Sequence, residues 1–141
     1  MSDSLPVMDS AAVERLQDAA RKAAANAYAP YSRFRVGAAL LFDDGFVATG
    51  CNVENMSYGL TSCAERNALF SAISERGPRY KIVAIAVTNL NDAASPPCGA
   101  CRQVISEFVV ADAVVSFPGD HGLEVRPFAE LFPFTFHLDP Q

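Results

Sequence analysis

The middle of the chain carries the clearest secondary-structure pattern, in residues 62–108: SCAERNALFSAISERGPRYKIVAIAVTNLNDAASPPCGACRQVISEF. This pattern predicts a helix from Ser62 to Arg76, which Gly77-Pro78 ends. A buried strand is expected from Ile82 to Thr88, because the segment is short and rich in β-branched residues. Another helix is expected from Cys98 to about Phe108. Helices that alternate with a strand indicate an α/β sheet with parallel segments.

The flanking segments extend this sheet on both sides. Apolar residues at helical spacing predict a helix from Ser10 to Ala27. Two extended runs, Arg35–Phe42 and Phe46–Cys51, are joined by the turn signal Asp43-Asp44-Gly45 and predict a β-hairpin, which makes the sheet mixed. Ala113–Phe117 is expected to be a further strand, and the tail after it alternates short extended and helical pieces.

The composition is typical of one globular domain. The chain has 141 residues, of which 50% are hydrophobic and 19% charged, so it can bury a core and is not disordered. We expect a single domain over residues 1–141. The net charge of −5 and the pI of about 4.9 disfavour contact with phosphate backbones, so no nucleic-acid partner is expected.

The sequence favours the cytoplasm as the compartment. No apolar stretch is long enough to cross a bilayer, so no membrane association is expected, and the first residues lack the pattern of a signal peptide. In a reducing compartment, cysteines are better interpreted as metal ligands, catalytic thiols or buried small apolar residues than as disulfides. The chain has four of them: Cys51, Cys63, Cys98 and Cys101.

Three of these cysteines lie at the starts of predicted helices. Cys63 opens one helix, and Cys98 and Cys101 open the next. The positive end of a helix dipole and an adjacent metal both lower the pKa of a thiol. If the two helices pack side by side on one sheet, the three thiolates can converge on one zinc ion and leave its fourth position open, as in catalytic zinc sites.

Each motif taken alone also has a simpler interpretation. Ser62-x-x-Glu65 fits a capping box, in which Glu65 only ties back the start of its helix. Cys98-x-x-Cys101 fits a redox pair or an accidental spacing. Together, however, Cys-Ala-Glu followed at a distance by Pro-Cys-x-x-Cys matches the all-cysteine form of the zinc nucleobase deaminase signature.

The sequence resembles the small cytidine deaminases from about Tyr28 to Phe136. The resemblance is carried by an opening strand, a nucleoside-binding segment, two zinc motifs and a C-terminal segment: residues 31–39, 50–55, 63–66, 97–104 and 131–136. It implies a three-layer α-β-α fold around a central mixed five-stranded sheet. It also implies zinc-dependent hydrolysis of cytidine and 2′-deoxycytidine to the uracil nucleosides and ammonia, in pyrimidine salvage.

The resemblance assigns the catalytic centre to the two zinc motifs. Cys63, Cys98 and Cys101 would hold one zinc ion per chain, and Glu65 would move protons between the attacking water, N3 of the base and the departing amine. Three thiolates leave Zn²⁺ with a net negative ligand set. Arg66 could offset that charge by hydrogen bonding to ligand sulfurs, although an arginine on a helix surface is the simpler interpretation.

The resemblance also assigns a substrate site. Asn52 and Glu54 would hold the 3′-hydroxyl of the sugar, Phe34 would stack near the base, and Ala64 would contact the substrate. A turn asparagine, a surface glutamate and a core phenylalanine are the alternatives from the residues alone. Phe136 would cap the pocket of a neighbouring subunit.

The resemblance further implies a homotetramer with shared active sites. The apolar tail of Phe132, Phe134 and Phe136 supports this, because a lone monomer would struggle to cover it. The alternative is that the tail packs back on its own sheet. Met56 and Phe132 depart from the family pattern, which usually has a small residue and a leucine there.

Three other functions compete with cytidine deamination. A deaminase of an aminonucleoside antibiotic would share the zinc motifs, but Asn52-Val53-Glu54-Asn55 argues against it. A nucleic-acid-editing deaminase needs a basic channel for the strand, and the net charge of −5 does not indicate one. A non-catalytic zinc or redox module needs a fourth ligand and gives Glu65 no role.

Overall fold

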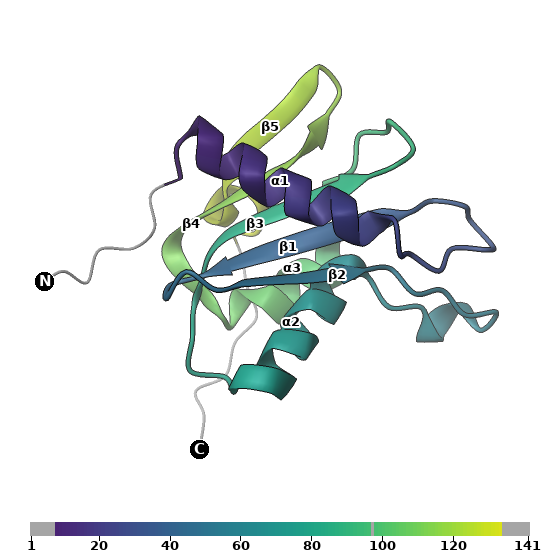
Figure 1. The fold of residues 1–141 in the computed structure, drawn as a ribbon, viewed down its shortest axis with the longest axis horizontal. Coiled ribbons are helices and arrows are strands. Elements are labelled where there is room, and N and C mark those ends of the chain that lie inside the picture. The colour runs from purple at the N-terminus through teal and green to yellow at the C-terminus, as the bar shows by residue number, and fades with distance from the viewer. Residues whose placement is uncertain (1–7, 97, 134–141) are drawn as a thin grey trace, which may run out of the picture.

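The computed structural model describes residues 8–96 and 98–133, which form an α/β fold (Figure 1). The elements, in chain order, are α1 (Ser10–Ala24), β1 (Val36–Phe42), β2 (Val47–Cys51), a short 3₁₀ helix (Tyr58–Leu60), α2 (Ala64–Arg76), β3 (Ile82–Asn89), α3 (Gly99–Ser106), β4 (Val109–Gly119), β5 (Gly122–Pro127) and α4 (Phe128–Leu131). None of the described helices is long and apolar enough to cross a membrane.

The five strands form one sheet in the order β2-β1-β3-β4-β5. β1 runs antiparallel to both β2 and β3, and β5 runs antiparallel to β4. β3 and β4 are parallel, and α3 is the crossover between them. The mixed five-stranded sheet is therefore confirmed.

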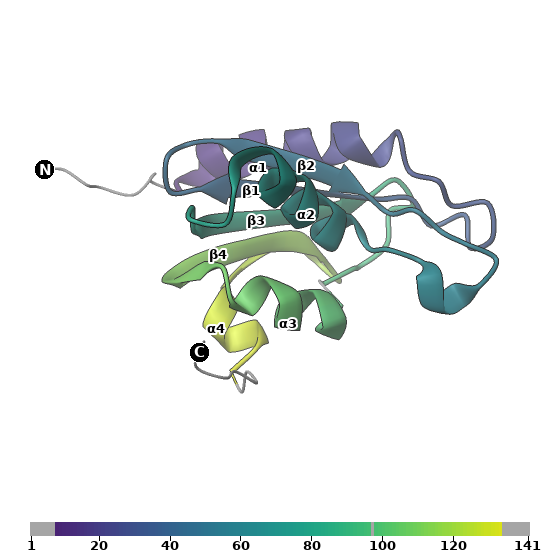
Figure 2. The same cartoon turned by 90° about the horizontal axis from the view of Figure 1, so that it is seen from below.

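Helices cover both faces of the sheet, which confirms the three layers (Figure 2). Leu16 and Ala20 of α1 pack on one face, against residues such as Ala86. α2, α3 and α4 lie on the other face, where they share a core with Leu40 and Ile85. Because both faces are covered, β3 is buried along its whole length.

Two glycines bring helices into direct contact with the sheet. A Cβ on Gly37 of β1 would lie 1.9 Å from the carbonyl oxygen of Ala20, so α1 packs backbone to backbone on this strand. A Cβ on Gly50 of β2 would lie 2.5 Å from the amide nitrogen of Ala68 in α2. Only glycine permits these approaches. The second one places the start of α2 next to the end of β2, where the candidate site lies.

Several element boundaries differ from the prediction. α1 ends at Ala24 rather than Ala27, and the backbone of Tyr28 instead bonds to Asn52 and Glu54. β4 begins at Val109, four residues earlier than the predicted strand at Ala113. The tail, predicted only as alternating short pieces, contains β5 and α4.

Candidate active site

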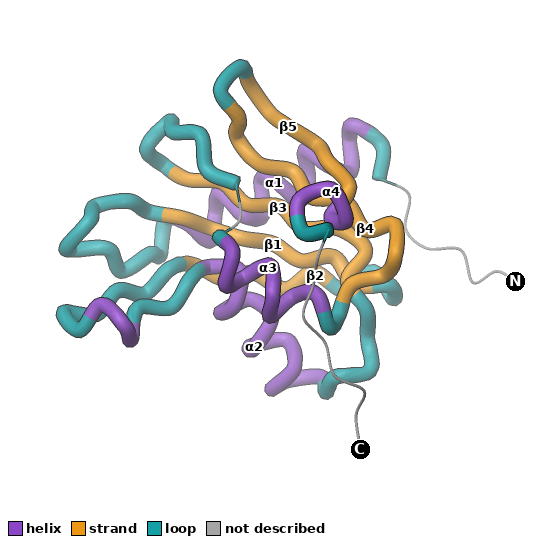
Figure 3. Tube along the Cα trace, turned by 180° about the vertical axis from the view of Figure 1, so that it is seen from behind, coloured by secondary structure: helices purple, strands orange, loops and turns teal. Residues whose placement is uncertain are grey.

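The three predicted metal ligands lie together at the starts of α2 and α3. Cys63 is the N-cap residue of α2, Cys98 is the N-cap residue of α3, and Cys101 lies in the first turn of α3. The loops that lead into these two helices meet at the same end of the sheet (Figure 3). Residues separated by a helix and a strand are thus brought to one point.

The three sulfurs lie close enough together to bind one metal ion. The Sγ atoms of Cys63 and Cys98 are 3.5 Å apart, those of Cys98 and Cys101 are 3.0 Å apart, and all three lie within 4.8 Å of one another. Tetrahedral zinc with Zn–S bonds of about 2.3 Å places its sulfurs about 3.8 Å apart. All three cysteines are free thiols rather than partners in a disulfide. Within residues 8–96 and 98–133, no fourth histidine, cysteine or carboxylate joins them, so the donor set fits zinc with one position open.

The three thiols of the cluster differ in their pKa. A hydrogen bond from Cys101, and then one from Arg66, lower the pKa of Cys63 to about 5 against the opposing effect of burial. The pKa of Cys101 is raised, first by its hydrogen bond to Cys63 and then by burial. Burial also raises the pKa of Cys98. Cys63 therefore has the lowest pKa of the three thiols.

Arg66 provides the positive charge beside this thiolate. Its Nη2 lies 3.4 Å from the sulfur of Cys63, and this hydrogen bond raises the pKa of Arg66. The buried Nε of Arg66 makes no hydrogen bond with the part of the chain that the structure describes. The side chain is thus turned toward the metal ligands, not toward solvent as the simpler interpretation would have it.

Glu65 is buried beside the sulfurs, with 3% of its surface exposed. Burial raises the pKa of its carboxyl, and the negative charge of Cys63 raises it further, against hydrogen bonds from backbone amides. The capping-box interpretation is wrong. The N-cap residue is Cys63, and the Ser62 hydroxyl lies 2.6 Å from Oδ1 of Asn67.

A cavity of about 250 Å³ opens next to Glu65 and the sulfurs. Four of the predicted substrate and catalytic residues line it: Phe34, Asn52, Ala64 and Glu65. Its remaining walls come from β1, β3, the start of α2 and the loop before α3: Val36, Thr61, Ser62, Cys63, Val87, Ser95, Pro96 and Cys98. The sequence did not single out Ser95 and Pro96, although both directly precede the second cysteine motif.

Asn52 and Glu54 lie in different surroundings. Asn52 is nearly buried in the cavity wall, where its side chain donates to the carbonyl of Phe34 and accepts from the amide of Val36. Glu54 lines an adjoining pocket of about 340 Å³, and Thr61 borders both spaces. The structure therefore does not bring both side chains into one cavity.

The carboxylate of Glu54 holds the loop that precedes β1. It accepts hydrogen bonds from the backbone amides of Tyr31 and Ser32, at 3.0 and 3.2 Å, and from the Ser32 hydroxyl. The bond from Ser32 lowers the pKa of Glu54.

Of the other residues that the sequence analysis named as departures from the family pattern or in the apolar tail, the structure describes Met56 and Phe132. Met56 is 79% exposed and does not line the cavity. Phe132 packs on its own chain, with its ring edge-on to Phe128 at 6.3 Å, so this part of the tail folds back as the alternative interpretation expected. Phe134 and Phe136 lie outside the described residues.

Asn67 is a residue of this region that the sequence did not reveal. Its side-chain nitrogen donates to the carbonyl of Cys51 at 2.8 Å, and its oxygen lies against the Ser62 hydroxyl. Asn67 therefore joins the end of β2 to the residue that precedes Cys63. An asparagine inside a helix gives no sequence signal for such a contact.

Comparison with known proteins agrees with this site. A model of the cytidine and deoxycytidylate deaminase zinc-binding region matches residues 10–117. A cytidine deaminase from Halalkalibacterium halodurans is 53% identical over 111 residues, which cover 78% of this chain and 83% of that protein. The crystal structure of a cytidine deaminase from Burkholderia pseudomallei superposes with a TM-score of 0.80 at 44% identity, covering 92% of this chain and 100% of the other. One from Mycobacterium tuberculosis superposes with a TM-score of 0.77 at 42% identity, covering 89% and 97%.

The match to the family model spans both cysteine motifs and Glu65. The fold, the three-sulfur cluster and these relatives lead to one conclusion: the chain belongs to the cytidine and deoxycytidylate deaminase family.

Proposed function

We propose that this chain is a zinc-dependent cytidine deaminase, which hydrolyses cytidine and 2′-deoxycytidine to the uracil nucleosides and ammonia in pyrimidine salvage. The observation that carries the proposal is the buried Glu65 carboxyl, which lines the same cavity as two of the three clustered cysteines. A structural zinc site or a redox pair would need no buried acid at this place. The family and its relatives supply the substrate class.

The residues around the cavity have distinct roles in this proposal. Cys63, Cys98 and Cys101 would hold a zinc ion, which would supply the Lewis acidity that lowers the pKa of the attacking water. Glu65 accepts a proton from the attacking water and delivers it to N3 of the base as the C4–O bond forms. It then carries the second proton to the amine as the C4–N bond breaks, so water and the nucleoside give ammonia and the uracil product.

The other side chains orient the nucleoside. Phe34 faces the base and Ala64 contacts it from the start of α2, since both line the cavity. Asn52 and Glu54 bind the sugar hydroxyl across the shared border at Thr61. Arg66 offsets the charge of the ligand sulfurs.

We further propose that the domain works as a homotetramer in the cytoplasm, with nucleosides and not nucleic acids as its partners. Large apolar side chains on the loops beside the cavity are exposed, and a second copy would cover them: Tyr28, Tyr31, Val53, Met56, Tyr58 and Leu60. The free thiols and the acidic composition support the compartment and the absence of a nucleic-acid partner.

Zinc content and ammonia release test the proposed function together. The purified protein should hold one zinc per chain and release ammonia from cytidine. Cys98→Ser should lose both properties, whereas Cys51→Ser, a change at a cysteine outside the cluster, should keep them. A metal-free protein with Cys98 and Cys101 joined by a disulfide would contradict the proposal.

A further inference from the structure

Side chains from other parts of the chain hold the segment just before β1. Ser32 bonds through its amide to Glu54 and accepts from the amide of Phe34 at 3.0 Å. Between these residues, Arg33 has a φ of 61°, in the left-handed region that a residue with a side chain adopts at some cost. Such a conformation persists only where its surroundings impose it.

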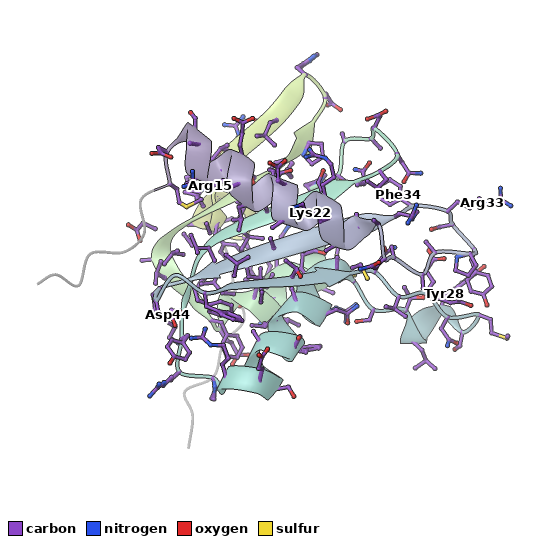
Figure 4. The ribbon with its side chains drawn as sticks, viewed as in Figure 1. Arg15, Lys22, Tyr28, Arg33, Phe34 and Asp44 are labelled. Carbon is purple, nitrogen blue, oxygen red and sulfur yellow. The ribbon has the colours of Figure 1, made fainter. Side chains whose placement is uncertain are left out.

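Asn91 makes the contacts that surround this strained residue and Phe34. Its Nδ2 donates to the carbonyl of Arg33 at 3.0 Å, and its Oδ1 accepts from the amide of Arg35 at 3.1 Å. One side-chain amide thus bonds to the backbone on both sides of Phe34. Arg33 and Phe34 lie at the end of the molecule away from Asp44, where the loops around the cavity gather (Figure 4).

Asn52 contacts the same segment one residue further along. Its Nδ2 donates to the carbonyl of Phe34 at 2.8 Å, and its Oδ1 accepts from the amide of Val36 at 2.9 Å. Two asparagines from separate segments therefore hold the backbone around Phe34. Asn91 bonds to Arg33 and Arg35, and Asn52 bonds to Phe34 and Val36. Asn52 follows β2 and Asn91 follows β3, so the position of Phe34 depends on both neighbours of β1.

Asn91 is itself held by the last residue of β3. Asn89 is buried, and its Oδ1 accepts from the amides of Asn91 and Ala93 while its Nδ2 donates to Ser95 Oγ. The loop that these bonds shape contributes Ser95 and Pro96 to the cavity wall. Through Asn91, this loop is connected directly to the segment that carries Phe34.

We propose that Asn91 is a positioning residue for the nucleoside base, acting through Phe34. It fixes the spacing between the Phe34 wall of the cavity and the Ser95–Pro96 wall, and so sets the width of the slot that receives a flat pyrimidine ring. This role rests on the proposed deaminase function. It concerns binding of the base and not proton transfer, because Asn91 does not line the cavity.

The kinetics of Asn91→Ala on cytidine test the role. The zinc-loaded variant should show a KM raised about fivefold, on the scale of one net hydrogen bond. Its kcat should change less than twofold, and its zinc content and melting temperature should stay close to the wild type. Asn91→Asp, which keeps the acceptor for Arg35 and loses the donor to Arg33, should raise KM in the same direction. Asn26→Ala, a change at an exposed asparagine at the end of α1, is the matched control and should leave KM unaltered.

A double-mutant cycle with Phe34→Ala separates positioning from general loss of structure. Phe34→Ala alone should raise KM about tenfold, on the scale of a base–aromatic contact. Adding Asn91→Ala should then raise KM by less than twofold more, because the ring that Asn91 positions is gone.

Each other outcome contradicts the inference. An Asn91→Ala enzyme with an unchanged KM, or two substitutions whose effects on KM simply multiply, would show that Asn91 does not act through Phe34. A wild-type enzyme that releases no ammonia from cytidine would overturn the proposed function as well, so the two failures are distinguishable.

Discussion

The guanidinium of Arg66 donates a hydrogen bond to the sulfur of Cys63, one helical turn before it, at 3.4 Å. The contact joins the N-cap residue of α2 to a charged side chain in the first turn of the same helix. It places a positive charge beside one of the three cysteines that could hold a metal ion. In the proposed zinc site, this cation would offset part of the charge of the ligand sulfurs.

This contact predicts the thiol chemistry of the metal-free protein. Since the pKa of Cys63 is lowered to about 5, this thiol is a thiolate above that pH and is protonated below it. Arg66→Gln removes one of the stabilising hydrogen bonds, so the pKa should rise and alkylation of Cys63 by iodoacetamide at pH 6 should slow severalfold. Peptide mass spectrometry after chelation measures the rate. Arg21→Gln, at an exposed arginine of α1, should have no effect. Equal rates in Arg66→Gln and the wild type would show that Arg66 does not stabilise the thiolate.

The role of Glu65 predicts a loss of turnover without a loss of metal. Glu65→Gln should keep one zinc per chain and nucleoside binding but lose roughly two or more orders of magnitude in kcat, the scale of general acid–base catalysis. Glu107→Gln, at an exposed carboxylate after α3, is the control. Near-normal turnover of Glu65→Gln would remove the proton-transfer role.

The sugar contacts predict how substrates are ranked. A site built to bond a hydroxyl rejects analogues that lack it, because its buried polar groups are left unpaired. Free cytosine and 3′-deoxycytidine should therefore have much lower kcat/KM than cytidine. Glu54→Gln should raise KM for cytidine. An uncharged amide is a weaker hydrogen-bond acceptor than the carboxylate, both for the sugar hydroxyl and for the backbone amides of Tyr31 and Ser32. If cytosine and cytidine were used equally well, Asn52 and Glu54 would have no part in the site.

The C-terminal tail predicts a link between assembly and substrate binding. If Phe136 caps the pocket of a neighbouring subunit, Phe136→Ala should leave the tetramer intact and raise KM about fivefold or more, given that base–aromatic stacking is worth roughly 1–3 kcal/mol. Phe132→Ala should instead lower thermal stability, because this ring packs on its own core. Sedimentation read beside kinetics distinguishes the two. A monomer with full activity would show that each pocket is complete within one chain.

The sequence predicted the elements that have strong local signals. The segment Ile82–Val87 is apolar throughout because β3 is covered on both faces, and the predicted strand, Ile82–Thr88, ends within one residue of the observed one. The cysteines are predicted to converge if their two helices pack side by side on one sheet, and the structure brings their sulfurs together. Reactive residues at the start of a helix can be recognised from a sequence, because both the residue type and the position of the helix start can be inferred from it.

The rest of the fold depended on contacts that no local pattern encodes. Nothing in the alanine-rich end of α1 predicts that the helix ends at Ala24, after which the chain turns and the amide of Tyr28 donates to the carbonyl of Asn52. β5 is exposed almost throughout, so it lacks the alternation that reveals a strand and is defined by its pairing with β4.

Polar contacts between distant segments were the least predictable part of the site. Asn52 was assigned to the sugar, yet its observed bonds are to the backbone of Phe34 and Val36. Asn67 in α2, Asn89 at the end of β3 and Asn91 in the loop after it give no sequence signal for such contacts. Their partners follow from the way the chain folds and not from neighbours in sequence.

The separation of Cys63 and Cys98 by 35 positions has a consequence for how the enzyme matures. A growing chain displays Cys63 before Cys98 has been synthesised, so the proposed zinc site would be complete only after α3 has formed. An ion held there would link two segments of the folded chain around β3, and its binding free energy would stabilise the folded state. In this proposal, zinc is acquired late in the biogenesis of the enzyme.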